Sequence, residues 1–223
     1  MKTLQQPPAE MGQRAQSAAG AASPLLVVIS APSGGGKTTL CQQLLATRPD
    51  LTRAITCTTR PARPGEKDGV DYYFLDAASF PRRVQAGDFL EHATVYGHRY
   101  GTLKSEVLGK LRRGQNVLLN VDVQGAATLR RRARQEPELG SALVSVFLTP
   151  PSVTVLAERL RGRGTDAPAV IEQRLRQARH EIAQWKHFDY LILSASIAED
   201  LRRMLAIIEA EHLRCRRAPP PQL

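Results

Sequence analysis

The segment 25–39 constrains the fold of this chain more than any other. It begins as an apolar run, Leu-Leu-Val-Val-Ile-Ser, turns at Ala-Pro-Ser-Gly-Gly-Gly, and ends in Lys-Thr-Thr. Glycine tolerates the dihedrals of a tight turn and lets an anion approach the backbone N–H groups closely. The helix expected after the turn would point its positive end at the same anion. The segment therefore predicts a strand, a phosphate-binding loop and the start of a helix.

The spacing of this loop assigns a role to each of its polar residues. Gly36, Lys37 and Thr38 match the end of the pattern G-x-x-x-x-G-K-[ST], although Ala31 stands where that pattern has its first glycine. Lys37 is expected to reach the β- and γ-phosphates of a nucleotide, while the Thr38 hydroxyl ligates Mg²⁺. A glycine-rich turn without a ligand is disfavoured by the strand and helix patterns around it. The expected ATP-binding residues are Ser33, Gly34, Gly35, Gly36, Lys37, Thr38 and Thr39.

Composition places the chain among folded α/β proteins. With 223 residues and 42% hydrophobic content, it can bury the core of one domain with a small insertion. No apolar run approaches the roughly 18 to 20 residues of a membrane span, and the first 24 residues lack the apolar segment of a secretory signal. Cys41, Cys57 and Cys215 are far apart, so neither a disulfide framework nor a zinc site is indicated. We expect a cytoplasmic protein without a membrane partner.

A net charge of +10 raises the question of a nucleic-acid partner. Arginines cluster at 130–134 and 214–217. Aromatic side chains that could stack on bases are not interleaved with them, and other arginines occur in motifs suited to small phosphates. Nucleic acid is therefore not expected as the main ligand, and the run 130–134 is interpreted as solvated surface.

The order of apolar segments predicts an α/β fold: an open, mostly parallel sheet flanked by helices, with an inserted small mixed α/β subdomain and a helical lid. Residues 1–23 are expected to be a disordered tail and 216–223 a flexible basic, proline-containing tail. The domain at 24–215 would have its core at 24–52 and 103–215, the insertion at 53–102 and the lid at about 159–176. Helices are expected at 39–47, 103–113, 152–161, 167–185 and 197–214, and strands at 25–30, 54–58, 72–75, 89–95, 116–121, 143–148 and 188–193.

A second group of residues predicts a second phosphate site. The segment 56–74 reads Thr-Cys-Thr-Thr-Arg-Pro-Ala-Arg-Pro-Gly-Glu-Lys-Asp-Gly-Val-Asp-Tyr-Tyr-Phe, so that Arg60 and Arg63 are braced by prolines and followed by tyrosines. Guanidinium groups suit phosphate oxygens, and tyrosine hydroxyls can complete the shell around them. One phosphate loop alone indicates a nucleotide hydrolase or kinase. A further basic site in an insertion points to a phosphorylated acceptor.

With both sites in view, the chain resembles the guanylate kinases of the P-loop nucleoside-monophosphate kinase superfamily, from about Leu25 to His212. The resemblance rests on the ordered segments S-A-P-S-G-G-G-K-T-T, T-T-R-P-A-R-P-G-E-K-D-G-V-D-Y, F-L-E-H-A, Y-G-H-R-Y-G-T, D-V-Q-G and R-L-R-G-R-G-T. It implies transfer of the γ-phosphoryl of ATP to GMP or dGMP, with Mg²⁺ as cofactor, in purine nucleotide metabolism.

The resemblance also implies roles for single residues. The implied GMP-binding residues are Thr56, Arg60, Arg63, Tyr72, Glu91, Tyr100, Thr102 and Asp122. Glu91 would read the base, because guanine presents N1–H and the N2 amine as adjacent donors that one carboxylate can accept, and adenine has no such pair. Asp122 would lie near Mg²⁺, binding it through water. The implied catalytic residues are Lys37 and the lid arginines Arg159, Arg163 and Arg174, which stabilise charge, so that no catalytic base is expected.

Two positions depart from the family pattern. Asn120 stands where guanylate kinases usually carry an acidic residue, and Ser194-Ala195-Ser196 replaces the usual Asn-Asp-Asp, so an adenine-contacting amide is missing. Two other interpretations remain open, a kinase of a phosphorylated sugar and a non-catalytic guanylate-kinase-like protein-binding module. The Arg60, Arg63, Tyr72 and Glu91 set argues against the first, and intact Gly36-Lys37-Thr38 against the second. The sequence leaves monomer and homodimer equally open.

Overall fold

The computed structural model describes residues 22–95, 97–162, 167–219 and 221, and two sheets organise them. The larger sheet has five parallel strands in the order β2-β7-β1-β8-β9. Its strands are β1 (Leu26–Ser30), β2 (Leu51–Arg53), β7 (Asn116–Asn120), β8 (Leu143–Thr149) and β9 (Tyr190–Leu193). This parallel sheet, flanked by helices, confirms the predicted α/β class.

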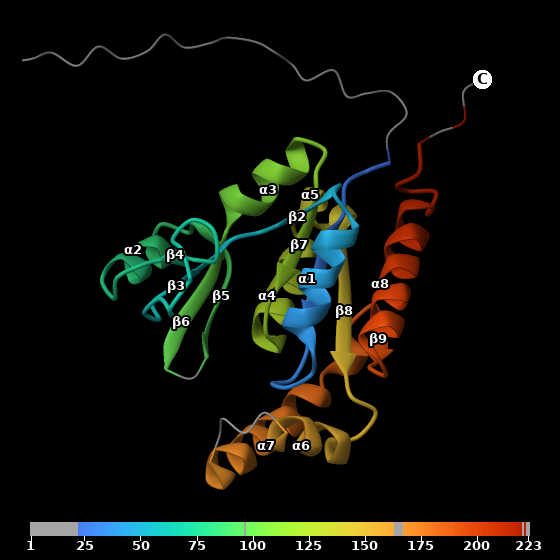
Figure 1. Cartoon of the computed structure of the whole chain (residues 1–223). Helices are drawn as coiled ribbons and strands as arrows, with labels where there is room; N and C mark the ends of the chain where they lie inside the picture. The colour runs from blue at the N-terminus through green and yellow to red at the C-terminus, as the bar shows by residue number, and fades with distance from the viewer. Residues whose placement is uncertain (1–21, 96, 163–166, 220, 222–223) are drawn as a thin grey trace, which may run out of the picture.

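Helices cover both faces of the larger sheet (Figure 1). The covering helices are α1 (Lys37–Thr47), α3 (Lys104–Arg112), α4 (Val123–Ala133), α5 (Pro137–Ala142) and α8 (Ile197–His212). On β1, Val27 and Ile29 pack in one core with α1 and α8, while Leu26 and Val28 pack in the other with α3, α4 and α5. Burial on both faces explains why β1, β7 and β8 carry almost continuous apolar runs.

The smaller sheet lies in the segment predicted as the insertion. Its order is β4-β3-β6-β5, and α2 (Ser79–Gln85) packs against it. Its strands are β3 (Thr56–Thr58), β4 (Tyr73–Phe74), β5 (Phe89–Val95) and β6 (His98–Leu103). Strand β6 was not predicted from the sequence, because two glycines made the segment resemble a turn. Gly101 instead serves packing, since a Cβ there would lie 2.9 Å from the Phe89 ring.

A pair of helices flanks the phosphate loop at the end of the molecule shown lowest in Figure 1, where the lid was predicted. They are α6 (Val153–Arg161) and α7 (Pro168–Ile182), and a short 3-10 turn, η1 (Trp185–His187), follows them. Leu156 and Leu160 of α6 pack with Ile171 and Ala178 of α7. Leu156 and Leu160 also lie against Gly34, so this helix pair touches the loop directly.

Helices α2, α4 and α5 were not predicted from the sequence. In α4 the arginine run hides an apolar stripe whose buried members include Ala126 and Leu129. The interpretation of 130–134 as solvated surface is wrong for Arg130, which is half-buried with its guanidinium 4.5 Å from the centre of the Phe188 ring. An aromatic face can hold a desolvated guanidinium, which is why this arginine leaves the solvent.

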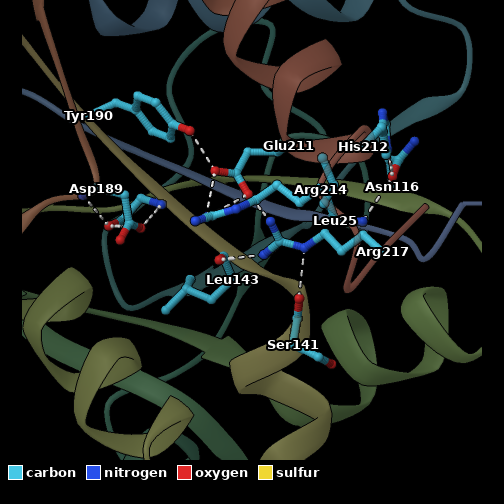
Figure 2. Close-up of polar contacts among 11 residues, drawn as sticks. Leu25, Asn116, Ser141, Leu143, Asp189, Tyr190, Glu211, His212, Arg214 and Arg217 are labelled. Carbon is cyan, nitrogen blue, oxygen red and sulfur yellow. Dashed lines mark hydrogen bonds and ion pairs between the residues drawn. The ribbon is translucent and has the colours of Figure 1, made fainter.

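The C-terminal tail expected from residue 216 needs correction, because Arg217 is only 2% exposed. Its guanidinium donates to the backbone oxygens of Ser141 (2.9 Å) and Leu143 (3.1 Å) and is ion-paired with buried Glu211 (Figure 2). The Arg217 carbonyl also accepts a hydrogen bond from the Ser23 N–H at 2.9 Å. The folded part therefore extends to Arg217 and includes Ser23, whereas most of the predicted N-terminal tail, 1–21, lies outside the described residues.

Within the described ranges, no helix combines the length and the apolar character needed to cross a membrane.

Candidate active site

The phosphate loop joins the carboxyl end of β1 to the amino end of α1. Gly34 and Gly36 adopt φ values of 86° and 94°, a left-handed conformation that other residues rarely take. At Gly34 a Cβ would also lie only 2.8 Å from Leu160 of the lid helix. Gly36 caps α1 without a side-chain hydrogen bond, which leaves N–H groups of the first turn for an anion.

A cavity of about 290 Å³ opens over this loop. All seven residues predicted to bind ATP line it. The lining residues are Ala31, Pro32, Ser33, Gly34, Gly35, Gly36, Lys37, Thr38, Thr39, Val95, Asp122 and Glu181. The structure thus brings a lysine, two threonine hydroxyls and two carboxylates to one concave surface, and below it is called the donor cavity.

Lys37 extends from the first turn of α1 into the site and donates a hydrogen bond to the Val121 carbonyl at 2.9 Å. Burial lowers the pKa of its ammonium, and the neighbouring Cys41, Asp122 and Glu181 act in the opposite direction. A partly buried ammonium with one carbonyl partner can form further hydrogen bonds, since it has three donors. Lys37 is therefore positioned to bind an incoming anion.

A second cavity, of about 270 Å³, lies between the two sheets and is called the acceptor cavity. Its lining residues are Lys37, Arg53, Ala54, Thr56, Tyr72, Glu91, Ala93, Val95, Tyr100, Asn120, Val121 and Asp122. It shares Lys37, Val95 and Asp122 with the donor cavity. Molecules bound in the two cavities would therefore meet at the Lys37 ammonium and the Asp122 carboxylate.

Five predicted GMP-binding residues line the acceptor cavity, namely Thr56, Tyr72, Glu91, Tyr100 and Asp122, and three do not. Arg60 donates to both carboxylate oxygens of Glu66, at 2.8 and 2.9 Å, and its guanidinium lies 5.4 Å from the centre of the Tyr72 ring. Arg63 is exposed beside it. Thr102 is fully buried and donates to Glu91 at 2.6 Å, so it acts on the cavity through that carboxylate.

Glu91 is the most buried ionisable group of the acceptor cavity, with 3% of its surface exposed. Burial raises the pKa of its carboxyl to about 7, and the nearby Asp122 charge acts in the same direction. The Thr102 hydroxyl opposes the shift by donating to the carboxylate. A ligand with further N–H donors would stabilise the ionised form in the same way.

Two of the predicted lid arginines, Arg159 and Arg174, are not among the described residues that line the two cavities. Arg159 is half-buried on α6 and donates to the Ser194 hydroxyl at 3.1 Å, and this hydroxyl donates to Asp200 at 2.7 Å. Arg174 lies on α7. Arg163 lies outside the described residues.

Two charged residues of the site were not predicted from the sequence. Glu181 of α7 lines the donor cavity, where burial raises the pKa of its carboxyl and the Lys37 charge lowers it. Its Oε1 accepts from Gln177 at 3.2 Å, and its Oε2 is buried without a hydrogen bond among the described residues. Arg53 lines the acceptor cavity and donates to the Asp71 carbonyl at 2.7 Å. No sequence pattern distinguishes Glu181 or Arg53 from the exposed charged residues near them in the chain.

The donor cavity contains ligands that suit Mg²⁺. The Thr38 hydroxyl and the Asp122 carboxylate are hard oxygen donors on the same concave surface. Across the described ranges, no group of three or more His, Cys, Asp or Glu side chains could hold a metal by itself. One or two protein oxygens fit a magnesium ion that keeps several waters and binds nucleotide phosphates as well.

Two cavities that meet at one lysine suit a transfer between two bound molecules, and the glycine-rich loop after β1 has a backbone that suits a phosphate group. The class defined by this fold and site is the P-loop nucleoside-monophosphate kinases.

The comparison with known proteins gives the particular family. The family model described as guanylate kinase matches residues 23–211, so the chain belongs to the guanylate kinase family. It is 46% identical over 188 residues to guanylate kinase of Coxiella burnetii, covering 84% of this chain and 88% of that one. Guanylate kinase of Alcanivorax borkumensis is also 46% identical, with 84% and 87% covered. A crystal structure of guanylate kinase from Anaplasma phagocytophilum matches with a TM-score of 0.72 at 32% identity, covering 89% of this chain and 92% of that one.

Proposed function

We propose that this protein transfers the γ-phosphoryl of Mg·ATP to GMP, and to dGMP, and releases ADP and GDP. The observation that carries the proposal is the pair of cavities that share Lys37 and Asp122. In-line transfer requires donor and acceptor phosphates to meet at one point, and the protein contributes positioning and charge stabilisation rather than covalent chemistry. Membership of the guanylate kinase family supports the choice of substrates.

The acceptor cavity offers a specific site for guanine. The Glu91 carboxylate can accept hydrogen bonds from the N1–H and the N2 amine together. Tyr72 and Tyr100 line the same cavity and provide hydroxyl groups for the phosphate. Arg60 is paired with Glu66 in this structure, so binding the GMP phosphate would require Arg60 to exchange or share that partner. Arg63 would join from its exposed position beside it.

The donor cavity supplies positive charge for the phosphates of ATP. Lys37 and the N–H groups at the start of α1 would bind the β- and γ-phosphates. Thr38, together with Asp122 through water, would hold Mg²⁺. Bound there, Mg²⁺ would neutralise phosphate charge and orient the transferring group. Arg159, Arg163 and Arg174 would add charge stabilisation if the lid helices move toward the loop.

A direct product assay tests this proposal. Purified protein is mixed with ATP, GMP and Mg²⁺, and all nucleotides are separated by chromatography over time. We expect GDP and ADP to form in equal amounts and to depend on both GMP and Mg²⁺. ADP without GDP would indicate a hydrolase instead. The location in the cytoplasm stays a prediction from the sequence.

A further inference from the structure

Gly125 lies in the first turn of α4, directly against the carboxylate that faces the acceptor cavity. A Cβ on Gly125 would lie 2.6 Å from Glu91 Oε2 and 3.2 Å from Glu91 Cδ. Contacts this short do not occur between a side-chain carbon and a carboxylate oxygen, so any larger residue would have to displace one of them. The carboxylate therefore occupies the space in which a side chain at position 125 would stand.

The backbone at Gly125 does not itself require glycine. Gly125 is absent from the positive-φ glycines of the described chain and has helical geometry in α4. Within a helix, alanine is more favourable than glycine, because glycine loses more conformational freedom on folding. Local helix stability therefore favours alanine at this position. Only the close approach of Glu91 and Val121 favours glycine.

The backbone of the same residue also holds the second carboxylate of the acceptor cavity, Asp122. The Gly125 N–H donates to Asp122 Oδ1 at 2.8 Å and so caps α4. Glu91 is fixed from two sides, with Thr102 donating to Oε1 at 2.6 Å and the Gly125 backbone packed against Oε2. Glu91 and Asp122 are thus both positioned by one residue without a side chain.

We propose that Gly125 is a positioning residue for acceptor specificity, because its missing side chain sets where the Glu91 carboxylate meets the base. The inference rests on the proposed function and adds to it a residue that never touches the substrate. Shifting Glu91 should disrupt the simultaneous acceptance of N1–H and the N2 amine, so the advantage of guanine over a base that lacks the amine should fall.

The test compares Gly125→Ala with Gly109→Ala, using GMP and IMP as acceptors. IMP carries hypoxanthine, which has the N1–H but lacks the N2 amine. Gly109 is a matched control, because it is a helical glycine in α3 whose Cβ would come no closer than 3.6 Å to the flexible end of Arg113. We expect Gly125→Ala to raise KM for GMP at least about tenfold, with KM for ATP within about twofold of the original. The preference for GMP over IMP should fall by a similar factor, and Gly109→Ala should change neither.

A second background separates contact with Glu91 from a general effect on α4. Val121 Cβ would lie 3.1 Å from the new methyl group, so the helix could also shift for that reason. Glu91→Asp shortens the carboxylate side chain and makes room. We expect Gly125→Ala to cost less than about threefold in kcat/KM for GMP when Glu91→Asp is already present. An equal cost in both backgrounds would overturn the inference.

Folding and function are checked separately. If Gly125→Ala does not fold but the double variant does, the obstruction is Glu91 and the inference stands; if neither folds, it is overturned. A folded Gly125→Ala protein with unchanged KM for GMP and unchanged preference over IMP also overturns it. The unaltered protein is assayed before any variant is made. If it does not phosphorylate GMP, the proposed function itself is refuted.

Discussion

Lys37 is the residue on which both cavities depend. It is partly buried, its ammonium donates to the Val121 carbonyl, and two carboxylates lie near it. Among the described residues, the carboxylates of Glu91, Asp122 and Glu181 border the two cavities, and Lys37 lines both. Its charge therefore offsets these carboxylates in the free protein, and under the proposed function it would also stabilise phosphate in the complex.

Replacing Lys37 should remove most of the transfer activity. We expect Lys37→Ala to lower kcat by about 10²- to 10³-fold or more, the usual cost of losing one preorganised charge-stabilising donor. Circular dichroism should show an intact fold, because the ammonium contributes little apolar packing. Lys186→Ala, a change at an exposed residue of η1, serves as the control. Near-original turnover in folded Lys37→Ala protein would refute the role of this loop.

Glu91 should make GMP use depend on pH. Its pKa is raised to about 7, so a growing fraction of the free protein carries a protonated carboxyl as the pH falls below 7. A protonated carboxyl cannot accept from both guanine donors, so kcat/KM for GMP should fall toward about tenfold per pH unit below 7 and level off above it. Glu91→Gln cannot titrate and should keep only the titration of GMP's own phosphate, near pH 6. Parallel profiles for both proteins would contradict this expectation.

At the scale of elements, polar groups at the junction between β9 and α8 form hydrogen bonds with other groups of the protein. Ser194 is 5% exposed and bonded to both Arg159 and Asp200, and Asp200 also accepts from the Ala195 N–H at 3.1 Å. These groups are therefore unavailable to the base of a donor nucleotide. Donor affinity would come mainly from the triphosphate, through contacts that do not depend on the base.

The protein should consequently accept other purine triphosphates as donors. We expect dATP, GTP and ITP to be used with kcat/KM penalties equivalent to only about 1 to 2 kcal/mol relative to ATP, the scale of one neutral hydrogen bond. The measurement is a comparison of kcat/KM for the four donors at saturating GMP. A preference for ATP beyond about a thousandfold would show that other residues read adenine.

Sequence patterns predicted those elements whose environment is simple. Strands β1, β7 and β8 are buried on both faces, so their apolar runs are unambiguous. Helix α4 was missed because four of its residues are arginines or glycine. Its packing is evident only in the structure, where the Arg130 guanidinium lies over the Phe188 ring. Strand β6 was missed because Gly101 looks like a turn signal in sequence, while in space it fits under an aromatic ring.

The site residues also divide into those that local sequence predicts and those that it does not. All residues predicted for the phosphate loop line the donor cavity, because they are contiguous and each one follows from local geometry, while their binding of ATP stays a prediction. Glu181 was missed because α7 brings it to the loop from far along the chain. The pairing of Arg60 with Glu66 was also not foreseen, since both residues lie in one loop whose conformation the sequence alone does not define.

At the scale of the whole molecule, the site and the contact between Ser23 and Arg217 lie at opposite ends of the strands of the parallel sheet. The phosphate loop follows the carboxyl end of β1, whereas Arg217 binds the Leu143 carbonyl at the amino end of β8. Figure 2 shows the Arg217–Glu211 pair with Tyr190, which donates to the same carboxylate. This cluster closes the fold far from the chemistry.

Breaking the cluster should affect stability without affecting catalysis. Arg217→Ala leaves the Glu211 carboxylate buried without its main partner, so we expect a loss of about 3 to 5 kcal/mol in the free energy of unfolding. Arg214 bonds the same carboxylate but has a 53% exposed side chain, so Arg214→Ala should cost less than about 1 kcal/mol. Denaturant titration measures both, and kcat at 25 °C should stay unchanged. Equal losses for the two variants would contradict this account of the cluster.

The central claim, that the acceptor cavity selects a guanine nucleotide monophosphate for transfer, is tested most directly by an acceptor panel. ADP formation from Mg·ATP is followed in a coupled assay with GMP, dGMP, AMP, UMP or CMP as the only acceptor. We expect turnover with GMP and dGMP, and kcat/KM at least about 10⁴-fold lower with the other three, the discrimination that buried hydrogen-bonding sites achieve. Comparable rates with AMP, or no turnover with GMP, would contradict the claim.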